Sequence, residues 1–262
     1  MPARYEFLDH PGPIPFAHRG GAAEAPENSR AAFSHALDLG YRYLETDVYA
    51  TSDGEVVAIH DPDLARTADR PGRISELSWS EVCAARLPGD QRILRLDDVL
   101  EEWPDACWNI DTKHDAAVEP LARVLSRASA VGRVCVTSFS DRRLAKVRQL
   151  LGPSLCTATG PAAITALRLG SLVPLARVAS ELGRTRWAAA AATQVPIRQG
   201  RIPVVDARFV AFAHRCGLAV HVWTVDDAAE MDRLLDLGID GIMTDRPTVL
   251  KEVLVRRGQW VA

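Results

Sequence analysis

The sequence predicts an α/β fold, a closed (β/α)8 barrel that fills one domain over residues 1–262. Strand-like and helix-like segments alternate along nearly the whole chain, which is the pattern of βα units around a parallel sheet. The eight strand-like segments suit a closed barrel better than an open sheet. A length of 262 residues is also usual for such a barrel with one buried core.

The eight predicted strands are short, mainly apolar segments. In chain order they are Pro15–His18, Tyr43–Tyr49, Trp108–Lys113, Val134–Ser138, Leu155–Thr159, Thr193–Pro196, Ala219–Val225 and Gly241–Thr244. Helices are expected between them, with Ser, Asn or Asp at the start and Gly after the end. Two helices have both signals, namely Asn28 or Ser29 with Gly40, and Asp226 or Asp227 with Gly238.

The regular alternation is interrupted between the second and third strands. Val56–His60 is a short extra strand after the turn at Ser52–Gly54, and residues 61–96 are too long for a simple crossover helix. The prolines and glycines of this stretch favour a small, loop-rich cap with one helical turn near Ser80–Arg86. We expect this insertion to lie over the barrel mouth, beside the strand ends that carry the chemistry.

The composition is that of an ordinary globular protein and excludes several function classes. With 47% apolar residues, 25% charged residues and a net charge of −3, the chain has no general attraction to nucleic acid or anionic membranes. The five cysteines are scattered without a C-x-x-C pair, so neither a disulfide framework nor a zinc site is predicted. Met1–Pro15 does not resemble a secretory signal, and no apolar stretch reaches the roughly 18 residues that span a bilayer. We therefore expect a cytoplasmic protein.

Residues with catalytic potential follow or occupy the predicted strands. His18 and His60 each come directly after an apolar, strand-like run, and Glu45 and Asp47 lie two residues apart on one strand face. Two imidazoles can transfer protons and paired carboxylates can hold a divalent cation, as cleavage of a phosphate ester requires. These residues indicate a metal-assisted phosphodiesterase.

Alternation along two further strands adds residues to the same predicted pocket. Asn109, Asp111 and Lys113 share a face of the third strand, and His221 and Trp223 share a face of the seventh. If these faces point into the barrel near its C-terminal rim, their side chains meet the two histidines and the acidic pair. Oxygen ligands without a thiolate suit Mg²⁺ or Ca²⁺.

Nine short motifs occur in an order that resembles the glycerophosphodiester phosphodiesterase family. They are His18-Arg19-Gly20-Gly21, Pro26-Glu27-Asn28-Ser29, Glu45-Thr46-Asp47-Val48, Asp53-Gly54, His60-Asp61-Pro62, Leu64-Ala65-Arg66-Thr67, Asn109-Ile110-Asp111-Thr112-Lys113, Val222-Trp223-Thr224-Val225 and Thr244-Asp245-Arg246-Pro247. No single motif is specific, but chance production of the ordered set is very improbable. Residues 162–194 contain no landmark of the family.

The resemblance implies a TIM barrel with a small insertion after the second strand. Its implied activity is the hydrolysis of glycerol phosphodiesters to sn-glycerol 3-phosphate and an alcohol, with a bound divalent cation. Carried over to this sequence, His18 and His60 correspond to the general acid–base pair. Glu45, Asp47 and Asp111 correspond to the metal ligands.

The resemblance also implies contacts with the substrate. Arg19 and Lys113 correspond to cations that contact the phosphate, although Lys113 could instead pair with a neighbouring aspartate. Alternation from His18 would turn Arg19 away from the lumen unless the strand ends there. Trp223 is either a wall against the glycerol or alkyl group or a core residue. Asp111 stands where the family usually has glutamate, which is one methylene longer, so we expect looser metal contact, contact through water or a shifted backbone.

Three functions of different classes remain open from the sequence. The leading one is a glycerophosphodiesterase that scavenges phospholipid products. The second is a lysophospholipase D at a membrane surface, because Leu167–Ala192 is rich in alanine and leucine, although an ordinary outer helix is the favoured interpretation of that segment. The third is a non-catalytic barrel that binds phosphodiesters or a protein. The leaving alcohol, the metal, the nucleophile (water or the glycerol 2-hydroxyl), the base of the histidine pair and the oligomeric state also remain open.

Overall fold

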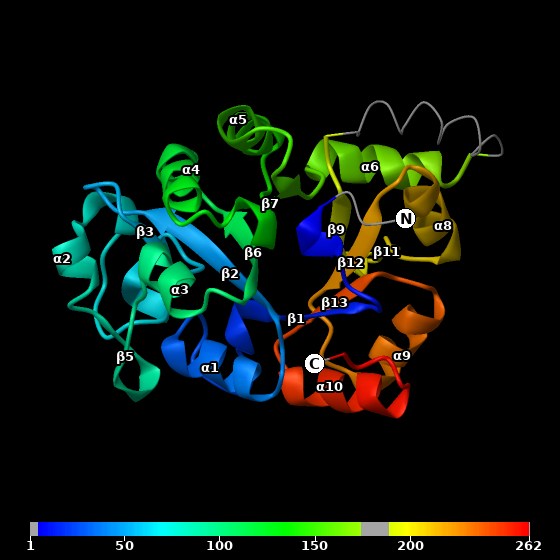
Figure 1. Ribbon diagram of the computed structural model, residues 1–262, viewed down its shortest axis with the longest axis horizontal. Helices are drawn as coiled ribbons and strands as arrows, with labels where there is room; N and C mark the ends of the chain where they lie inside the picture. The colour runs from blue at the N-terminus through cyan, green and yellow to red at the C-terminus, as the bar shows by residue number, and fades with distance from the viewer. Residues whose placement is uncertain (1–4, 174–188, 262) are drawn as a thin grey trace.

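Eight parallel strands form a nearly closed barrel in the computed structural model, which describes residues 5–173 and 189–261 (Figure 1). The strands are β1 (Ile14–Ala17), β2 (Tyr43–Ala50), β6 (Cys107–Thr112), β7 (Val134–Thr137), β8 (Cys156–Thr157), β9 (Ala192–Pro196), β12 (Ala219–Trp223) and β13 (Gly241–Thr244). Their order is β8-β7-β6-β2-β1-β13-β12-β9, and every neighbouring pair is parallel. The predicted (β/α)8 barrel is confirmed, and each predicted strand overlaps an observed one.

The barrel closes between the two strands at the ends of this order, β8 and β9. A parallel bridge joins Ala158 to Ala192. Next to it, the Thr159 amide donates to the Ala192 carbonyl over 2.8 Å, and the Ala191 amide donates to the Thr157 carbonyl over 2.9 Å. The pairing between β8 and β9 is short because β8 consists of two residues, Cys156 and Thr157. The barrel wall therefore continues across this join through a short pairing.

Helices cover the outside of the barrel (Figure 1). They are α1 (Arg30–Asp38), α3 (Leu96–Glu102), α4 (Val118–Arg127), α5 (Asp141–Leu151), α6 (Pro161–Gly170), α8 (Ala207–Arg215), α9 (Ala228–Asp236) and α10 (Pro247–Arg256). Helix α4 shows why these segments are helical. Its residues Val118, Leu121 and Leu125 are buried at spacings of three and four, whereas Glu119 and Arg123 are exposed.

The structure decides which polar residue begins each of two helices. The Ser29 hydroxyl accepts a hydrogen bond from the Ala32 amide over 3.2 Å, so Ser29 rather than Asn28 is the cap of α1. The Asp227 side chain accepts from the Glu230 amide over 2.9 Å and caps α9. Asn28 has a φ of 54° instead, and its side chain lies among the buried polar groups.

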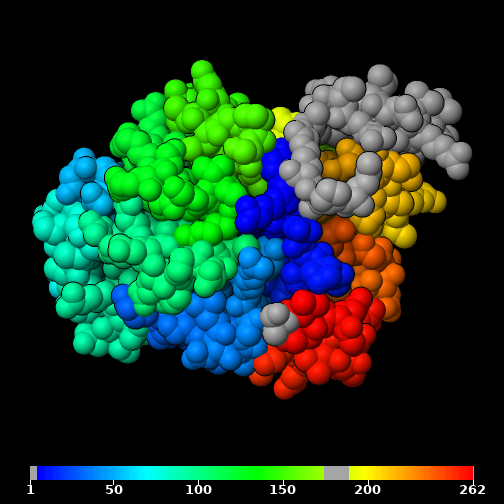
Figure 2. All heavy atoms as spheres, viewed as in Figure 1, coloured from blue at the N-terminus to red at the C-terminus, as the bar shows by residue number. Residues whose placement is uncertain are grey.

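Aromatic side chains fill the N-terminal end of the barrel. Phe7, in the short helix η1 (Glu6–Leu8), packs against Phe16 and Tyr43 with ring centroids 6.1 and 5.3 Å away. The C-terminal part of the chain also packs against an early part, because the Tyr41 hydroxyl donates to the Pro247 carbonyl over 2.7 Å and the Tyr41 ring centroid lies 5.1 Å from that of Trp260. Figure 2 shows the last residues, in red, beside early residues in blue. One end of the barrel is thus occupied by core, and polar chemistry is confined to the other.

The chain between β2 and β6 forms an insertion on one side of the barrel (Figure 1). In order, its elements are β3 (Val56–Ala58), η3 (Leu64–Arg66), η4 (Ile74–Glu76), α2 (Trp79–Val82), β4 (Arg86–Leu87), η5 (Pro88–Asp90) and β5 (Gln91–Arg92). Strand β3 pairs antiparallel with β2, and β4 with β5. The insertion has a small apolar core, made of Val57, Ile59, Leu64, Ile74, Val82, Ala85, Leu87 and Ile93.

Two details of the insertion differ from the prediction. The extra strand ends at Ala58 instead of His60, because the ladder with β2 ends at the pair of Val48 and Ala58. The helical turn is Trp79–Val82 and is shorter than expected. The Ser78 amide donates to the Glu81 side chain over 2.8 Å, which fixes the start of this turn, and Arg86 belongs to the β4–β5 pair. Among the described residues, no helix is long and apolar enough to cross a membrane.

Candidate active site

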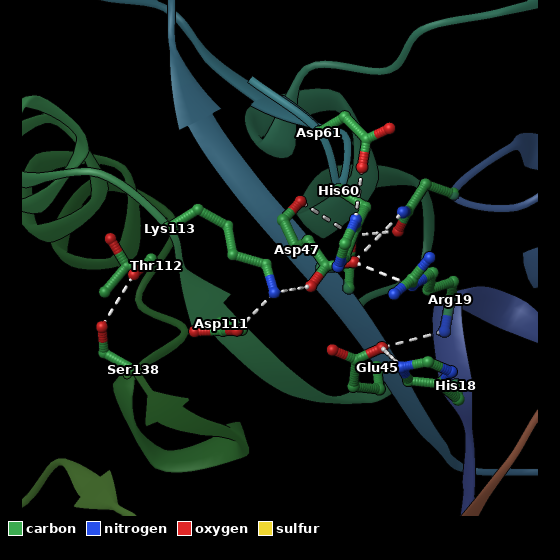
Figure 3. Close-up of polar contacts among 12 residues, drawn as sticks. His18, Arg19, Glu45, Asp47, His60, Asp61, Asp111, Thr112, Lys113 and Ser138 are labelled. Atoms are coloured by element: carbon green, nitrogen blue, oxygen red, sulfur yellow. Dashed lines mark hydrogen bonds and ion pairs between the residues drawn. The ribbon is translucent and has the colours of Figure 1, made fainter. Parts of the chain in front are cut away.

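A cavity of about 660 Å³ opens at the C-terminal ends of the barrel strands. All eight residues predicted for the site line this cavity; they are His18, Arg19, Glu45, Asp47, His60, Asp111, Lys113 and Trp223. They come from the turn after β1, from β2, from the segment after β3, from the end of β6 and the residue after it, and from β12, which are far apart in the sequence. Figure 3 shows how the charged ones among them lie around one space.

A tight turn after β1 directs both His18 and Arg19 into the cavity. The strand ends at Ala17, and the turn that follows has φ values of 53° at Arg19 and 82° at Gly20. A Cβ atom on Gly20 would lie 2.7 Å from that of Ala32, so the turn requires glycine there. Because the strand ends before His18, alternation no longer applies to Arg19.

His18 is held from both sides by carboxylates. Its Nδ1 lies 2.6 Å from Asp245 Oδ1. Its Nε2 lies 3.8 Å from Glu45 Oε2, and Figure 3 shows these two side chains next to each other. Burial acts to lower the pKa of His18, but Glu45 and Asp245 outweigh it and raise this pKa above the usual value. Asp245 is itself fixed, because its amide donates to Asp226 Oδ1 over 2.8 Å.

The Nδ1 of His60 also lies beside a carboxylate, as the Nδ1 of His18 does. Asp61 Oδ1 lies 2.6 Å from this nitrogen, and the other oxygen of Asp61 accepts from Arg66 Nε. The Arg66 contact, followed by that of His60, lowers the pKa of Asp61 to about 2. The Nδ1 of each histidine is therefore engaged, which leaves Nε2 of each imidazole for proton transfer.

Three carboxylates lie buried on adjacent strands. Glu45 and Asp47 are on β2 and Asp111 is on β6, where Asp111 is the direct partner of Asp47. Burial, together with the charge of Asp47, raises the pKa of Glu45 to about 7. Burial also raises the pKa of Asp111, although Lys113 opposes this shift. For Asp47, Lys113 and Arg19 outweigh burial and lower the pKa.

Two cations neutralise this acidic group. Lys113 Nζ lies 2.8 Å from Asp47 Oδ1 and 2.7 Å from Asp111 Oδ2, and Arg19 Nε lies 3.1 Å from Asp47 Oδ2 (Figure 3). The Arg19 amide also donates to Glu45 Oε2 over 2.9 Å. Lys113 thus pairs with Asp111, as one interpretation of the sequence expected, and in addition with Asp47.

The donor set fits a hard divalent cation in its chemistry. Glu45, Asp47 and Asp111 offer oxygen atoms only, and Asp111 Oδ1 is buried without a hydrogen-bond partner. Within residues 5–173 and 189–261, however, no three acidic, histidine or cysteine side chains converge closely enough to hold an ion as they stand. Lys113 bridges two of the three acids, Asp47 and Asp111, so its ammonium group would compete with an ion for their oxygen atoms.

One side of the cavity lining is mainly apolar. It is built by residues after β7, in α6, at the end of β9 and in the chain that follows β9, namely Phe139, Pro161, Ile164, Leu169, Pro196, Ile202 and Val204, together with Trp223. The rings of Phe139 and Trp223 meet edge to face with centroids 5.8 Å apart, so Trp223 belongs to the cavity wall. Ile202 is in a short hairpin, β10 (Arg198–Gln199) and β11 (Ile202–Pro203), which the sequence analysis did not predict. Much of the segment Leu167–Ala192 lies outside the described residues.

Sequence reasoning missed three residues of this site. Asp61 directly follows His60 in the motif His60-Asp61-Pro62, so its position beside a candidate catalytic histidine could have indicated its role. Asp245 follows Thr244, which is the register partner of Ala17, and a closed barrel therefore places it opposite His18. Phe139 carries no such signal, since an exposed aromatic residue after a strand has no characteristic spacing.

The comparisons with known proteins agree with this geometry. Residues 18–249 match the Glycerophosphoryl diester phosphodiesterase family. The chain is 40% identical over 260 residues to the Mycobacterium tuberculosis protein named "Probable glycerophosphodiester phosphodiesterase 2", covering 97% of this chain and 96% of that one. It is also 28% identical to the rat protein named "Lysophospholipase D GDPD1", covering 91% of this chain and 85% of that one.

Solved structures share the fold of this chain. A glycerophosphodiester phosphodiesterase from Agrobacterium tumefaciens superposes with a TM-score of 0.74 at 24% identity, covering 92% of this chain and 99% of that one. A phosphodiesterase from Oleispira antarctica, solved in complex with the product sn-glycerol-3-phosphate, gives a TM-score of 0.76 at 20% identity, covering 93% and 97%. At these identities the likeness concerns the barrel architecture.

Proposed function

Because the chain belongs to the glycerophosphoryl diester phosphodiesterase family, and is thus a phosphodiesterase hydrolase, we propose that it hydrolyses glycerophosphodiesters to sn-glycerol 3-phosphate and an alcohol. One observation carries the proposal. His18 and His60, each with a carboxylate 2.6 Å from Nδ1, share a cavity with three buried carboxylates and two cations. Proton transfer and charge stabilisation, the two requirements of phosphodiester cleavage, are thereby available in one place.

In this proposal the two histidines carry the protons. One imidazole takes the proton from the attacking oxygen through its Nε2, and the other gives a proton to the leaving alkoxide. Asp245 and Asp61 stabilise the imidazolium that forms in each case, because each accepts the Nδ1–H of its histidine. Either histidine can act as the base, and the nucleophile is water or the 2-hydroxyl of the glycerol.

Charge on the phosphoryl oxygens is met by cations. Glu45, Asp47 and Asp111 would hold a divalent ion, Mg²⁺ or Ca²⁺, which when bound supplies a positive charge beside a non-bridging oxygen. Lys113 and Arg19 provide fixed positive groups at the same wall, 2.7–3.1 Å from Asp47 or Asp111. An ion that displaced Lys113 from the carboxylates would leave its ammonium group free for the phosphate.

The test is the release of sn-glycerol 3-phosphate from glycerophosphocholine by the wild-type protein and by His18→Ala and His60→Ala. We expect activity that is lost with a chelator and restored by Mg²⁺ or Ca²⁺. Each substitution should lower kcat by about 10²- to 10⁴-fold without lowering the melting temperature by more than a few degrees. Folded variants that keep the wild-type rate would instead support a barrel that only binds phosphodiesters or a protein.

A second candidate, a lysophospholipase D, is supported by the apolar side of the cavity. Phe139, Leu169 and Ile202 are 61–65% exposed, which is unusual for large apolar residues beside a charged site. An acyl chain on the substrate would cover them. Long-chain lysophosphatidylcholine should then be cleaved with a lower KM than glycerophosphocholine, and Ile202→Asn should raise that KM whereas Val255→Asn, an exposed residue on α10, should not. Equal KM values for the two substrates would exclude this candidate.

We further propose that the protein acts in the cytoplasm on products of phospholipid breakdown. Cys83, Cys107 and Cys135 are free thiols, and Cys107 and Cys135 share one buried cluster without a disulfide between them. Free thiols are usual in a reducing compartment. Cell fractionation with an antibody to the chain would test this location, and recovery outside the cytoplasmic fraction would overturn it.

A further inference from the structure

Two sequence motifs without a role in the proposed chemistry contact each other in the structure. Glu27 lies in the loop before α1, and Arg66 lies in η3 of the insertion. The Arg66 guanidinium donates to both oxygens of Glu27, over 3.0 Å and 2.7 Å. Its remaining nitrogen, Nε, donates to Asp61. A single side chain of the insertion therefore binds two carboxylates that belong to different parts of the site.

Each of these carboxylates holds a residue that faces the cavity. Asp61 holds His60 through the contact of 2.6 Å at Nδ1. Glu27 holds Arg19, whose terminal nitrogen donates to Glu27 Oε1 over 3.3 Å. The Asp61 end of this arrangement and the Arg19 end are both visible in Figure 3. Arg66 thus links His60 and Arg19, between which the described residues show no direct hydrogen bond.

The backbone that carries Arg66 is well anchored. Leu64 is fully buried in the core of the insertion, and its amide donates to the Gly72 carbonyl over 2.9 Å. Asp63 caps the turn by accepting from the Ala65 amide over 2.8 Å. Asp61 and Glu27 therefore contact the guanidinium of a residue whose backbone is held in place. A residue that positions others needs such an anchored backbone.

We propose that Arg66 is a positioning residue that fixes His60, through Asp61, and Arg19, through Glu27, at the same time. This inference rests on the proposed function of the site. Three of the five N–H donors of a guanidinium are used here in a planar fork, an arrangement that the ammonium group of lysine cannot reproduce. The insertion accordingly takes part in catalysis through this arginine.

The kinetic test compares Arg66→Met and Arg66→Lys with a control, Arg70→Met. Arg70 lies in the same insertion and pairs with its neighbour Asp69 on the surface. We expect Arg66→Met to lower kcat by about 10²-fold, because small displacements of catalytic groups have effects of that size. Arg66→Lys should recover part of this loss, and Arg70→Met should leave kcat and KM unchanged. A wild-type kcat in folded Arg66→Met would overturn the proposal.

A coupled effect distinguishes positioning from general loss of structure. If Arg66 acts in part through Asp61, Arg66→Met should slow the Asp61→Asn protein by a smaller factor than it slows the wild type, and the factor that remains is the part transmitted through Glu27 to Arg19. If the double variant instead loses kcat by the product of the factors lost in the two single variants, Arg66 does not act through Asp61.

A second readout does not require activity. Nitrogen-15 NMR of labelled histidine reports which ring nitrogen of His60 carries the proton. In the wild type we expect the Nδ1–H form, and in Arg66→Met a clear loss of this form, because Asp61 is no longer held in line. An unchanged tautomer would refute the positioning role. If the wild type cleaves no phosphodiester but the tautomer changes as expected, the proposed function fails, and only the structural part of the inference, that Arg66 orients His60 through Asp61, stands.

Discussion

At the residue scale, the two histidines of the site share one arrangement that the sequence reveals only in part. Asp61 follows His60 directly, so its contact with Nδ1 is local. Asp245 is 227 residues away from His18, and its contact depends on the parallel pairing of β1 with β13. Residue types at strand ends could thus be predicted from the sequence, whereas the partner of His18 required the closed barrel.

The first prediction concerns Asp245. Replacing it with asparagine should lower kcat by roughly 10²- to 10⁴-fold, because an amide can donate to Nδ1 of His18 and so favour the wrong tautomer. The measurement is steady-state hydrolysis of glycerophosphocholine. Asp232→Asn on α9, which removes a surface contact with Arg256, serves as the control and should keep wild-type rates. A fully active Asp245→Asn protein would show that this contact has no catalytic role.

The second prediction concerns His221, a fully buried residue of β12. Burial lowers the pKa of His221 to about 4, against a usual value of 6.5. The unfolded chain therefore takes up a proton below pH 6.5 that the folded chain refuses until about pH 4, and stability is lost as the pH falls through this window. The loss should be about 1.4 kcal/mol per pH unit for this group.

Urea unfolding of the wild type and of His221→Gln at pH 7, 6 and 5 tests the effect. The variant is less stable at pH 7, since Gln194 loses its contact of 3.3 Å with the imidazole. Its free energy of unfolding should nevertheless fall less steeply with pH than that of the wild type. If the free energy of unfolding falls equally with pH in the wild type and in His221→Gln, the pKa of His221 is the same in the folded and the unfolded chain.

At the element scale, the turn after β1 determines what the site contains. Because β1 stops at Ala17, His18 and Arg19 both face the cavity, which strict alternation would forbid. The sequence supplied the glycines at positions 20 and 21 but not the strand end itself. Strand ends depend on the neighbouring strands, and one of the two neighbours of β1, β13, comes from the far end of the chain.

The third prediction uses this turn. Gly20→Ala forces a φ of 82° on alanine and brings its Cβ to 2.7 Å from Ala32, so helix α1 must shift. Gly89→Ala has a φ of 69° but no neighbour within 4 Å and is the matched control. Urea unfolding should show a cost of about 1–2 kcal/mol for the control and a larger one for Gly20→Ala. Hydrolysis should fall in Gly20→Ala alone, and equal costs would contradict the close approach.

The insertion shows where prediction from sequence becomes weak. Its existence and approximate range followed from length, proline and glycine content and the extra strand. The position of its helical turn did not, because a reciprocal cap between Ser78 and Glu81 determines it. The contact of Arg66 with Glu27 was also beyond reach, since it joins two loops 39 residues apart.

At the scale of the whole molecule, the barrel could be predicted because eight apolar segments with interspersed helices leave few alternatives. Most of the predicted site residues followed from the rule that catalytic groups lie at the C-terminal ends of such strands, whereas Arg19 came from the family resemblance. The pairing within the site did not follow. Lys113 bridges Asp47 and Asp111, and Phe139 forms part of a wall, because side-chain packing determines both.

The fourth prediction is that barrel and insertion form one folding unit, which we propose for the whole chain. Strand β3 pairs with β2, and Arg66 binds Glu27 outside the insertion, so neither part keeps all its contacts alone. Calorimetry and circular dichroism should therefore show one coincident thermal transition. A separate early transition, abolished by deletion of residues 61–96, would show two units.

The most direct test of the central claim is a crystal structure with Ca²⁺ or Mg²⁺ and sn-glycerol 3-phosphate. We expect the ion on Glu45, Asp47 and Asp111, with Lys113 Nζ moved from the carboxylates to the phosphate. The phosphorus should lie between Nε2 of His18 and Nε2 of His60, each within hydrogen-bond reach of an ester or attacking oxygen. A phosphate bound away from both imidazoles, or an ion that avoids all three carboxylates, would contradict the account.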